Sequence, residues 1–167
     1  MRSVKPHLLF IGITYTRFMN RIALSYLLTL LARRDYSAME IRYKMAEKAF
    51  SAEDIEQVLL HCQQQGWQSD RRFCESYLSS RSRKGYGPTR IRQELQQKGI
   101  ENPLIHEQLQ QCDLDWFALA ETTFHKKYSE MTGREWTPAL QQKAWRFMLS
   151  RGFNPDHFSH LINAEPD

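Results

Sequence analysis

Apolar side chains recur at every third or fourth position along most of the chain, a spacing that places them on one face of a helix. The first run covers residues 19–33, and two more runs begin at Ser37 and Ser51. Each serine is followed three positions later by an acidic residue, which is typical of a helix N-terminus because the two side chains cap backbone N–H groups. The pattern therefore predicts three helices in the first part of the chain.

The same pattern continues toward the C-terminus, with glycine and proline at the expected helix boundaries. Pro88 follows Gly87 at a predicted helix start, where its missing N–H costs nothing, and Gly66 and Gly99 each follow a predicted helix end. The further helices are predicted over residues 70–83, from Pro88 to Gly99, from Asn102, over 114–131 and 138–151, and from Asn154. No alternation of β-branched and polar residues indicates a strand, so we predict an all-α fold.

The chain also repeats itself with a period of about fifty residues. Residues 20–62 align with residues 70–112 without a gap, and ten of the 43 positions are identical. The identical pairs are Arg21/Arg71, Leu28/Leu78, Arg33/Arg83, Tyr36/Tyr86, Ile41/Ile91, Arg42/Arg92, Lys48/Lys98, Ile55/Ile105, Leu59/Leu109 and Cys62/Cys112. Such a period predicts three tandem three-helix repeats that form an elongated, curved helical array.

The predicted domain boundaries follow from this repeat. We expect a disordered N-terminal extension at residues 1–18, with Met19 as an alternative initiator, and repeats over 19–68, 69–112 and 113–167. The chain is 41% hydrophobic and 25% charged, which is typical of a globular protein, and no apolar run approaches the ~20 residues of a membrane span. Three widely spaced cysteines favour the reducing cytoplasm, where we expect them to pack as small apolar groups.

Candidate catalytic chemistry is sparse. His157 and His160 have a spacing that can share a metal ion, but no cysteine or carboxylate pair accompanies them at ligand spacing, so a surface role is favoured. No phosphate-binding glycine loop and no nucleophile with a matching base can be assembled. We therefore predict a protein that is not an enzyme and needs no cofactor or metal.

Positive charge is concentrated in the middle of the chain. Residues 81–98 hold six cations and one carboxylate, Glu94, whereas the whole chain has a net charge of only +4. Cations at the end of the 70–83 helix are favoured by the helix dipole, but Arg90 and Arg92 follow a helix start, where the dipole opposes them. We expect both to be dispensable for stability and to bind a polyanionic or acidic partner. Tyr86 is expected to be mainly structural, as a hydrophobic staple with Ile91.

The central segment, Arg81-Ser82-Arg83-Lys84-Gly85-Tyr86-Gly87-Pro88 and on through Arg90-Ile91-Arg92 to Lys98-Gly99-Ile100, closely resembles the signature of the RecX family, regulators of the RecA recombinase. The resemblance extends from about Met19 to the C-terminus. It departs from the family in the extension at 1–18 and in Ala49-Phe50, which stands where the second repeat has Gly99-Ile100.

The resemblance implies a non-enzymatic protein built from tandem three-helix repeats. It implies binding in the groove of the RecA–single-stranded-DNA filament and inhibition of filament extension, ATP hydrolysis and strand exchange. We expect a cytoplasmic monomer that binds single-stranded DNA weakly and no membrane. The predicted partner-binding residues are Arg81, Arg83, Lys84, Tyr86, Arg90, Arg92 and Lys98. A stand-alone DNA-binding module and a helical scaffold for an unrelated protein are the alternatives.

Overall fold

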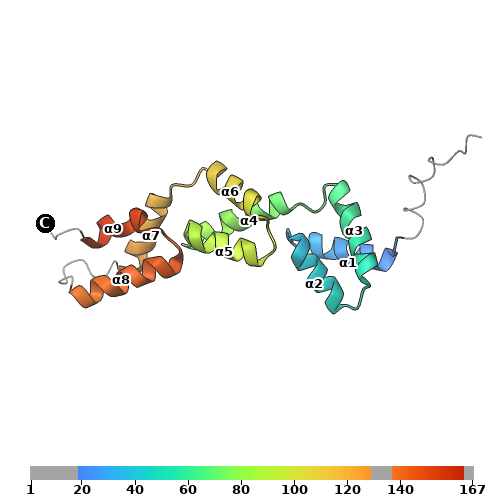
Figure 1. Cartoon of the computed structure of the whole chain (residues 1–167), viewed down its shortest axis with the longest axis horizontal. Coiled ribbons are helices and arrows are strands. Elements are labelled where there is room, and N and C mark those ends of the chain that lie inside the picture. The colour runs from blue at the N-terminus through green and yellow to red at the C-terminus, as the bar shows by residue number, and fades with distance from the viewer. Residues whose placement is uncertain (1–18, 129–136, 164–167) are drawn as a thin grey trace, which may run out of the picture. The chain divides into compact units, whose positions relative to one another are not determined.

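The computed structural model describes residues 19–128 and 137–163. Figure 1 labels the helices in these ranges, and no strand occurs among them, which confirms the prediction of an all-α fold. The helices are α1 (Arg21–Leu31), α2 (Ala38–Glu47), α3 (Ala52–Gln64), α4 (Asp70–Arg83), α5 (Pro88–Gln97), α6 (Asn102–Gln111), α7 (Trp116–Tyr128), α8 (Pro138–Arg151) and α9 (Pro155–Asn163). Within these ranges, every helix is too short or too polar to cross a membrane.

The capping pattern at the start of α2 is the predicted one. Ser37 Oγ accepts a hydrogen bond from the Glu40 N–H at 3.1 Å, and the Glu40 carboxylate accepts one from the Ser37 N–H at 3.3 Å. At the start of α3, Ser51 caps the helix in the same way, but the Asp54 carboxylate instead accepts a hydrogen bond from the Asn20 side chain at 2.8 Å. That bond ties the start of α3 to the start of α1, because the Asn20 side chain is also the cap of α1.

The chain consists of two compact units, Met1–Ser69 and Asp70–Asp167. In the first unit, α1, α2 and α3 pack around one apolar core. Its buried members are Ala23, Leu27, Leu30, Tyr36, Ala38, Ile41, Met45, Ile55, Val58, Leu59 and Cys62. Ala49, which follows the end of α2, has a positive φ of 62°. This left-handed backbone conformation is unfavourable in free energy for an L-residue that has a side chain. Gly99, at the matching position after α5, has a φ of 76°.

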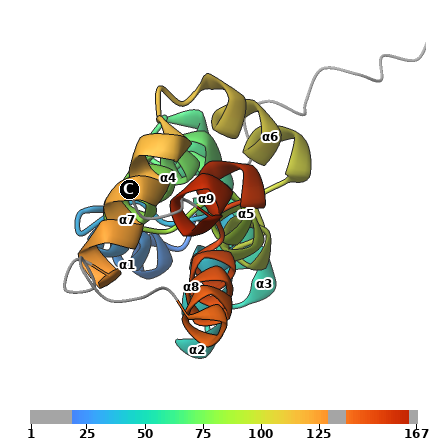
Figure 2. The same cartoon turned by 90° about the vertical axis from the view of Figure 1, so that its left-hand side faces the viewer.

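In the described part of the second unit, residues 70–128 and 137–163, six helices form two groups of three, each with its own core. In the first group, α4 packs against α5 and α6 around Phe73, Leu78, Ile91, Leu95 and Ile105. In the second group, α9 packs against both α7 and α8, as Figure 2 shows, around a buried set that includes Phe124, Met148, Phe153 and Phe158. Trp116, at the start of α7, contacts both cores and so joins the groups.

Some sequence predictions lie outside the described residues. These are the extension at 1–18 and the end of the helix expected over 114–131. Within the described part, α8 begins after Thr137, whose hydroxyl accepts a hydrogen bond from the Leu140 N–H at 3.3 Å. Leu140 packs partly buried against the core of the third helix group.

Candidate partner-binding site

The turn between α4 and α5 is bound to the C-terminal end of α8. The N–H of Gly87 donates a hydrogen bond to the carbonyl oxygen of Arg151 at 2.8 Å, and the N–H of Thr89 donates to that of Gly152 at 3.0 Å. A Cβ atom at Gly87 would lie 2.4 Å from the Gly152 carbonyl oxygen, so only glycine permits this approach. The Gly87-Pro88 pair of the signature therefore starts α5 and joins it to α8.

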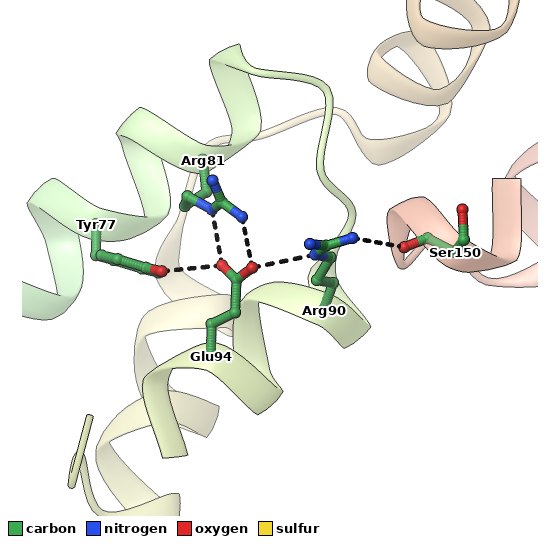
Figure 3. A network of polar contacts seen from close by, with 5 residues as sticks. All are labelled: Tyr77, Arg81, Arg90, Glu94 and Ser150. Carbon is green, nitrogen blue, oxygen red and sulfur yellow. Dashed lines mark hydrogen bonds and ion pairs between the residues drawn. The ribbon is translucent and has the colours of Figure 1, made fainter. Parts of the chain in front are cut away.

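Glu94 on α5 is the centre of a polar network, drawn in Figure 3. Its carboxylate accepts hydrogen bonds from the Tyr77 hydroxyl at 2.9 Å and from the Arg81 guanidinium, where the Nε–Oε2 distance is 2.7 Å. It also accepts one from Arg90 Nε at 3.0 Å. Burial alone would raise the pKa of Glu94, but the hydrogen bonds from these three donors outweigh it and hold the pKa below its ordinary value. Glu94 is thus a carboxylate that forms ion pairs with two arginines of the signature.

The network corrects the expectation for Arg90. The helix dipole opposes a cation at this position, so Arg90 was expected to add nothing to stability. In the structure, however, Arg90 forms an ion pair with Glu94, four residues later on the same helix. Its guanidinium also donates a hydrogen bond to the Ser150 carbonyl oxygen near the end of α8 at 3.1 Å (Figure 3). Arg81 is more enclosed still, with 19% of its side chain exposed. Both arginines therefore hold α4, α5 and α8 together.

Tyr86 lies among three arginines. The ring centroid is 3.8 Å from the guanidinium carbon of Arg81, 4.5 Å from that of Arg90 and 4.9 Å from that of Arg151. The ring is half-buried against the core that contains Ile91. Arginines within about 6 Å of an aromatic face are attracted to it. Tyr86 thus contributes to the same junction as the Glu94 network.

Arg92 differs from its counterpart in the first repeat. Arg42 forms a two-point ion pair with Glu56 on α3, at 2.7 Å and 3.2 Å. Fifty positions later, Arg92 is exposed, and His106 stands where Glu56 stands in the first repeat. Among the described residues, no carboxylate forms an ion pair with Arg92. The charge that the first repeat neutralises internally is thus left accessible in the second.

The remaining predicted site residues fall into two sets. Lys98 is half-buried, and its ammonium lies 5.4 Å from the ring centroid of Tyr77. Arg83 and Lys84, at the end of α4, are exposed and form no ion pair within the described ranges. They line an open cleft of about 350 Å³ together with residues of α7 and α8. Three cations of that cleft, Lys126, Lys127 and Arg151, were missed by the sequence analysis.

The structure gives the other chemistry-bearing residues packing or capping contacts. Within the described residues, no group of three or more histidine, cysteine or acidic side chains is placed to hold a metal ion. His157 Nδ1 accepts a hydrogen bond from the Asn154 N–H at 3.2 Å, which caps the start of α9. Cys62 and Cys74 are buried, and burial raises the pKa of the Cys74 thiol to about 11. Neither cysteine is therefore a thiolate near neutral pH.

The chain is similar in sequence to known proteins. A family model described as the first three-helix domain of RecX matches residues 23–62, and one described as the second three-helix domain matches residues 69–109. A curated protein named "Regulatory protein RecX" from Actinobacillus pleuropneumoniae serotype 5b (strain L20) is 47% identical over 146 residues, which are 87% of this chain and 94% of that protein. One of the same name from Haemophilus influenzae (strain PittEE) is 48% identical over 145 residues, 86% of this chain and 95% of that protein.

A solved structure is also similar. It is described as the crystal structure of regulatory protein RecX, and it superposes with a TM-score of 0.73 at 23% sequence identity. The superposition covers 86% of this chain and 71% of that one. Because the sequence identity is only 23%, this similarity is evidence for the fold alone.

Proposed function

The chain belongs to the RecX family, and we propose that it is a regulator that binds the filament of the recombinase RecA on single-stranded DNA. Bound in the groove of the filament, it limits filament extension, ATP hydrolysis and strand exchange without catalysing a reaction. It acts in the cytoplasm, as a monomer. The proposal is supported by the name "Regulatory protein RecX" of relatives that match over most of their length.

The observation that carries the proposal is the accessible charge of Arg92. A cation near a helix N-terminus opposes the dipole and adds little to stability when no carboxylate pairs with it. Arg42, its counterpart, is neutralised by Glu56, whereas Arg92 is left to a partner. An anionic partner explains a charge that the fold itself does not use.

The predicted site residues then have different tasks. Arg83, Lys84 and Arg92 are exposed and contact the filament, through DNA phosphates or acidic protein groups. Arg81, Tyr86 and Arg90 maintain the junction of α4, α5 and α8 that presents them. Lys98 lies against Tyr77 beside that junction. Contacts between exposed charges are screened by salt, so inhibition by this mechanism weakens as ionic strength rises.

The proposal is tested by titrating the protein into RecA assembled on circular single-stranded DNA while ATP hydrolysis is measured. We expect hydrolysis to fall at far less than one protein per RecA subunit, and the effect to shrink between 50 and 200 mM salt, about the range over which phosphate contacts weaken. Unchanged hydrolysis at every ratio would contradict the proposal.

A second candidate, a stand-alone module for nucleic acid, is favoured by the cluster of cations around the cleft of the second unit. This candidate requires tight binding of naked DNA together with no effect on RecA. The same titration, followed by a DNA-binding measurement without RecA, distinguishes the two functions. A scaffold for an unrelated protein requires that neither assay responds.

A further inference from the structure

An open groove of about 350 Å³ runs between α4 and α6 in the second unit. It shares no lining residue with the cleft that Arg83 and Lys84 line. Each of the two helices contributes side chains spaced one turn apart, so the groove follows the line along which α4 packs against α6. The lining residues are Glu75, Leu78 and Ser79 of α4, Gln108 and Gln111 of α6, and Cys112 and Leu114 just after α6.

Gln108 is a buried polar residue of this groove, with only 6% of its surface exposed. Among the described residues, none donates a hydrogen bond to its side-chain amide or accepts one from it. The amide is not sealed from solvent, and the groove is where Gln108 meets it. Nearly all buried polar groups of folded proteins have a hydrogen-bond partner, since an unbonded one is unfavourable. The exposed tip of Gln108 therefore points to a ligand that supplies the missing bonds.

The rest of the groove wall is largely apolar. Leu78 is buried in the core of the second helix group, and Cys112 and Leu114 pack partly buried against the same core. The Cys112 thiol already donates a hydrogen bond to the Leu109 carbonyl oxygen at 3.1 Å, so it offers a ligand mainly apolar surface. An amide beside an apolar wall matches a polypeptide chain, because a peptide group has a donor and an acceptor, as the Gln108 amide has.

The charge of the groove is negative. Among the described residues, Glu75 is the only charged one that lines it. Its side chain is exposed, and no described residue forms an ion pair with it. Arg71, one turn earlier on α4, is instead paired with Glu107 at 2.7 Å. A carboxylate left in this state favours a cationic ligand and disfavours a nucleic acid or an acidic chain.

We propose that this groove binds an extended peptide segment of a partner protein, with an apolar side chain against Leu78 and Leu114 and a peptide group paired with the Gln108 amide. A lysine or arginine next to that apolar side chain lies near Glu75. In such sites main-chain hydrogen bonds give affinity and a side-chain pocket gives specificity. The volume is at the lower end of the ~300–1,000 Å³ of ligand sites, which suits one side chain with its peptide group. The site goes beyond the proposed function, because it requires neither RecA nor DNA.

The test titrates the isotope-labelled full chain with a capped tetrapeptide of alanine, leucine, lysine and alanine, and follows it by NMR. We expect saturable shifts of the Gln108 side-chain amide and of the Cys112 and Leu114 backbone N–H groups, with a dissociation constant of about 1–10 mM. Glycine in place of the leucine should weaken binding at least about tenfold, because the apolar contact is lost. Glutamate in place of the lysine should weaken it about threefold or more, and Glu75→Gln should remove that difference.

Gln108→Met keeps the approximate size of the side chain and removes the amide, so it separates binding from stability. We expect it to bind the leucine–lysine peptide at least about fivefold more weakly, because the paired hydrogen bonds are lost. Its melting temperature should be no lower than that of the original protein, since an amide without a partner adds nothing to the fold. The control is Gln110→Met, which changes an exposed glutamine of α6 that does not line the groove and should bind like the original protein.

Three outcomes would overturn the proposal. The first is equal shifts with the leucine and glycine peptides, or equal binding by the Gln108→Met and Gln110→Met variants. The second is a melting temperature that falls by several degrees in Gln108→Met but not in Gln110→Met, because the amide would then serve the fold. The third is binding of capped leucine amide as tightly as the tetrapeptide, which would assign the groove to a small amide instead of a peptide chain.

Discussion

The backbone N–H of Gly87 donates a hydrogen bond to the carbonyl oxygen of Arg151 across 2.8 Å. With the neighbouring bond from Thr89 to Gly152, it uses carbonyl groups at the end of α8 that a helix leaves without an internal partner. These bonds tie the start of α5 to the end of α8. They explain in physical terms why the second and third helix groups form one compact unit.

Gly87→Ala should break this junction. The added methyl group would lie 2.4 Å from the Gly152 carbonyl oxygen and 2.5 Å from the Phe153 nitrogen, so backbone must move on one side. We expect a loss of about 2–4 kcal/mol in the free energy of unfolding, measured by urea denaturation followed by circular dichroism.

Gly66→Ala is the matched control for this variant. Gly66 has a φ of 72°, and a Cβ atom there would meet no atom within 4 Å, so only backbone strain of about 1–2 kcal/mol is added. If Gly87→Ala is no more destabilising than Gly66→Ala, the close approach of α5 to α8 is wrong.

Glu94→Gln should destabilise the second unit in a way that depends on pH. At pH 7 the variant leaves Arg81 and Arg90 without a carboxylate, and we expect a loss of about 1–3 kcal/mol. The folded-state pKa of Glu94 lies below its ordinary value of 4.5, so its contribution is complete above that pH and is lost as the pH falls below it. Melting temperatures of the two proteins, measured from pH 7 to pH 3, should therefore converge in acid. A difference that stays constant over this range would contradict the network.

Arg90→Ala and Arg92→Ala should separate structure from function. Sequence reasoning treats the two arginines alike, but Arg90 bonds to Glu94 and Ser150 whereas Arg92 is exposed. We expect Arg90→Ala to cost about 0.5–1.5 kcal/mol of stability, since its side chain is partly exposed, and Arg92→Ala to change stability by less than about 0.5 kcal/mol. Thermal unfolding of each single variant checks this, and equal destabilisation by the two would contradict the distinction.

Ala49→Gly should stabilise the first unit. Ala49 has a positive φ of 62°, which glycine adopts without strain. Relief of about 1–2 kcal/mol of strain is partly offset by the greater freedom of glycine in the unfolded chain, which leaves a gain of about 0.5–1 kcal/mol. Gly99→Ala, at the matching position after α5, should have the opposite effect on the second unit. Urea denaturation of both variants tests the pair, and a loss of stability on Ala49→Gly would contradict it.

The helices were predictable from sequence because their signals are local. Apolar spacing, the Ser37 capping box and the Gly87-Pro88 start each act within a few residues, and the structure has helices where they indicate. The repeat also identified the matching ends of α2 and α5, although it did not indicate that Ala49 would adopt the left-handed backbone of Gly99. The elongated, curved array stays a prediction.

The candidate site was less predictable because its contacts join distant segments. Arg90 meets Ser150 sixty residues later, and no local pattern indicates that bond. Lys126, Lys127 and Arg151 were overlooked because the last third of the chain has more acidic than basic residues, and net charge over a segment does not show where the charges gather. A comparison of ion-pair partners across the repeat, Glu56 against His106, is a sequence signal that identifies Arg92 as unpaired.

The central claim, that accessible cations of the second repeat bind the recombinase filament, is tested most directly by comparing Arg92→Gln with Arg42→Gln as inhibitors of ATP hydrolysis by RecA on single-stranded DNA. Both variants lose one charge at equivalent repeat positions, but only Arg92 is free of a carboxylate in the folded protein. We predict that Arg92→Gln needs at least about fivefold more protein for half-inhibition, as the loss of one charge contact of about 1 kcal/mol implies, and that Arg42→Gln inhibits like the original protein. Equal inhibition by the two variants would contradict the claim.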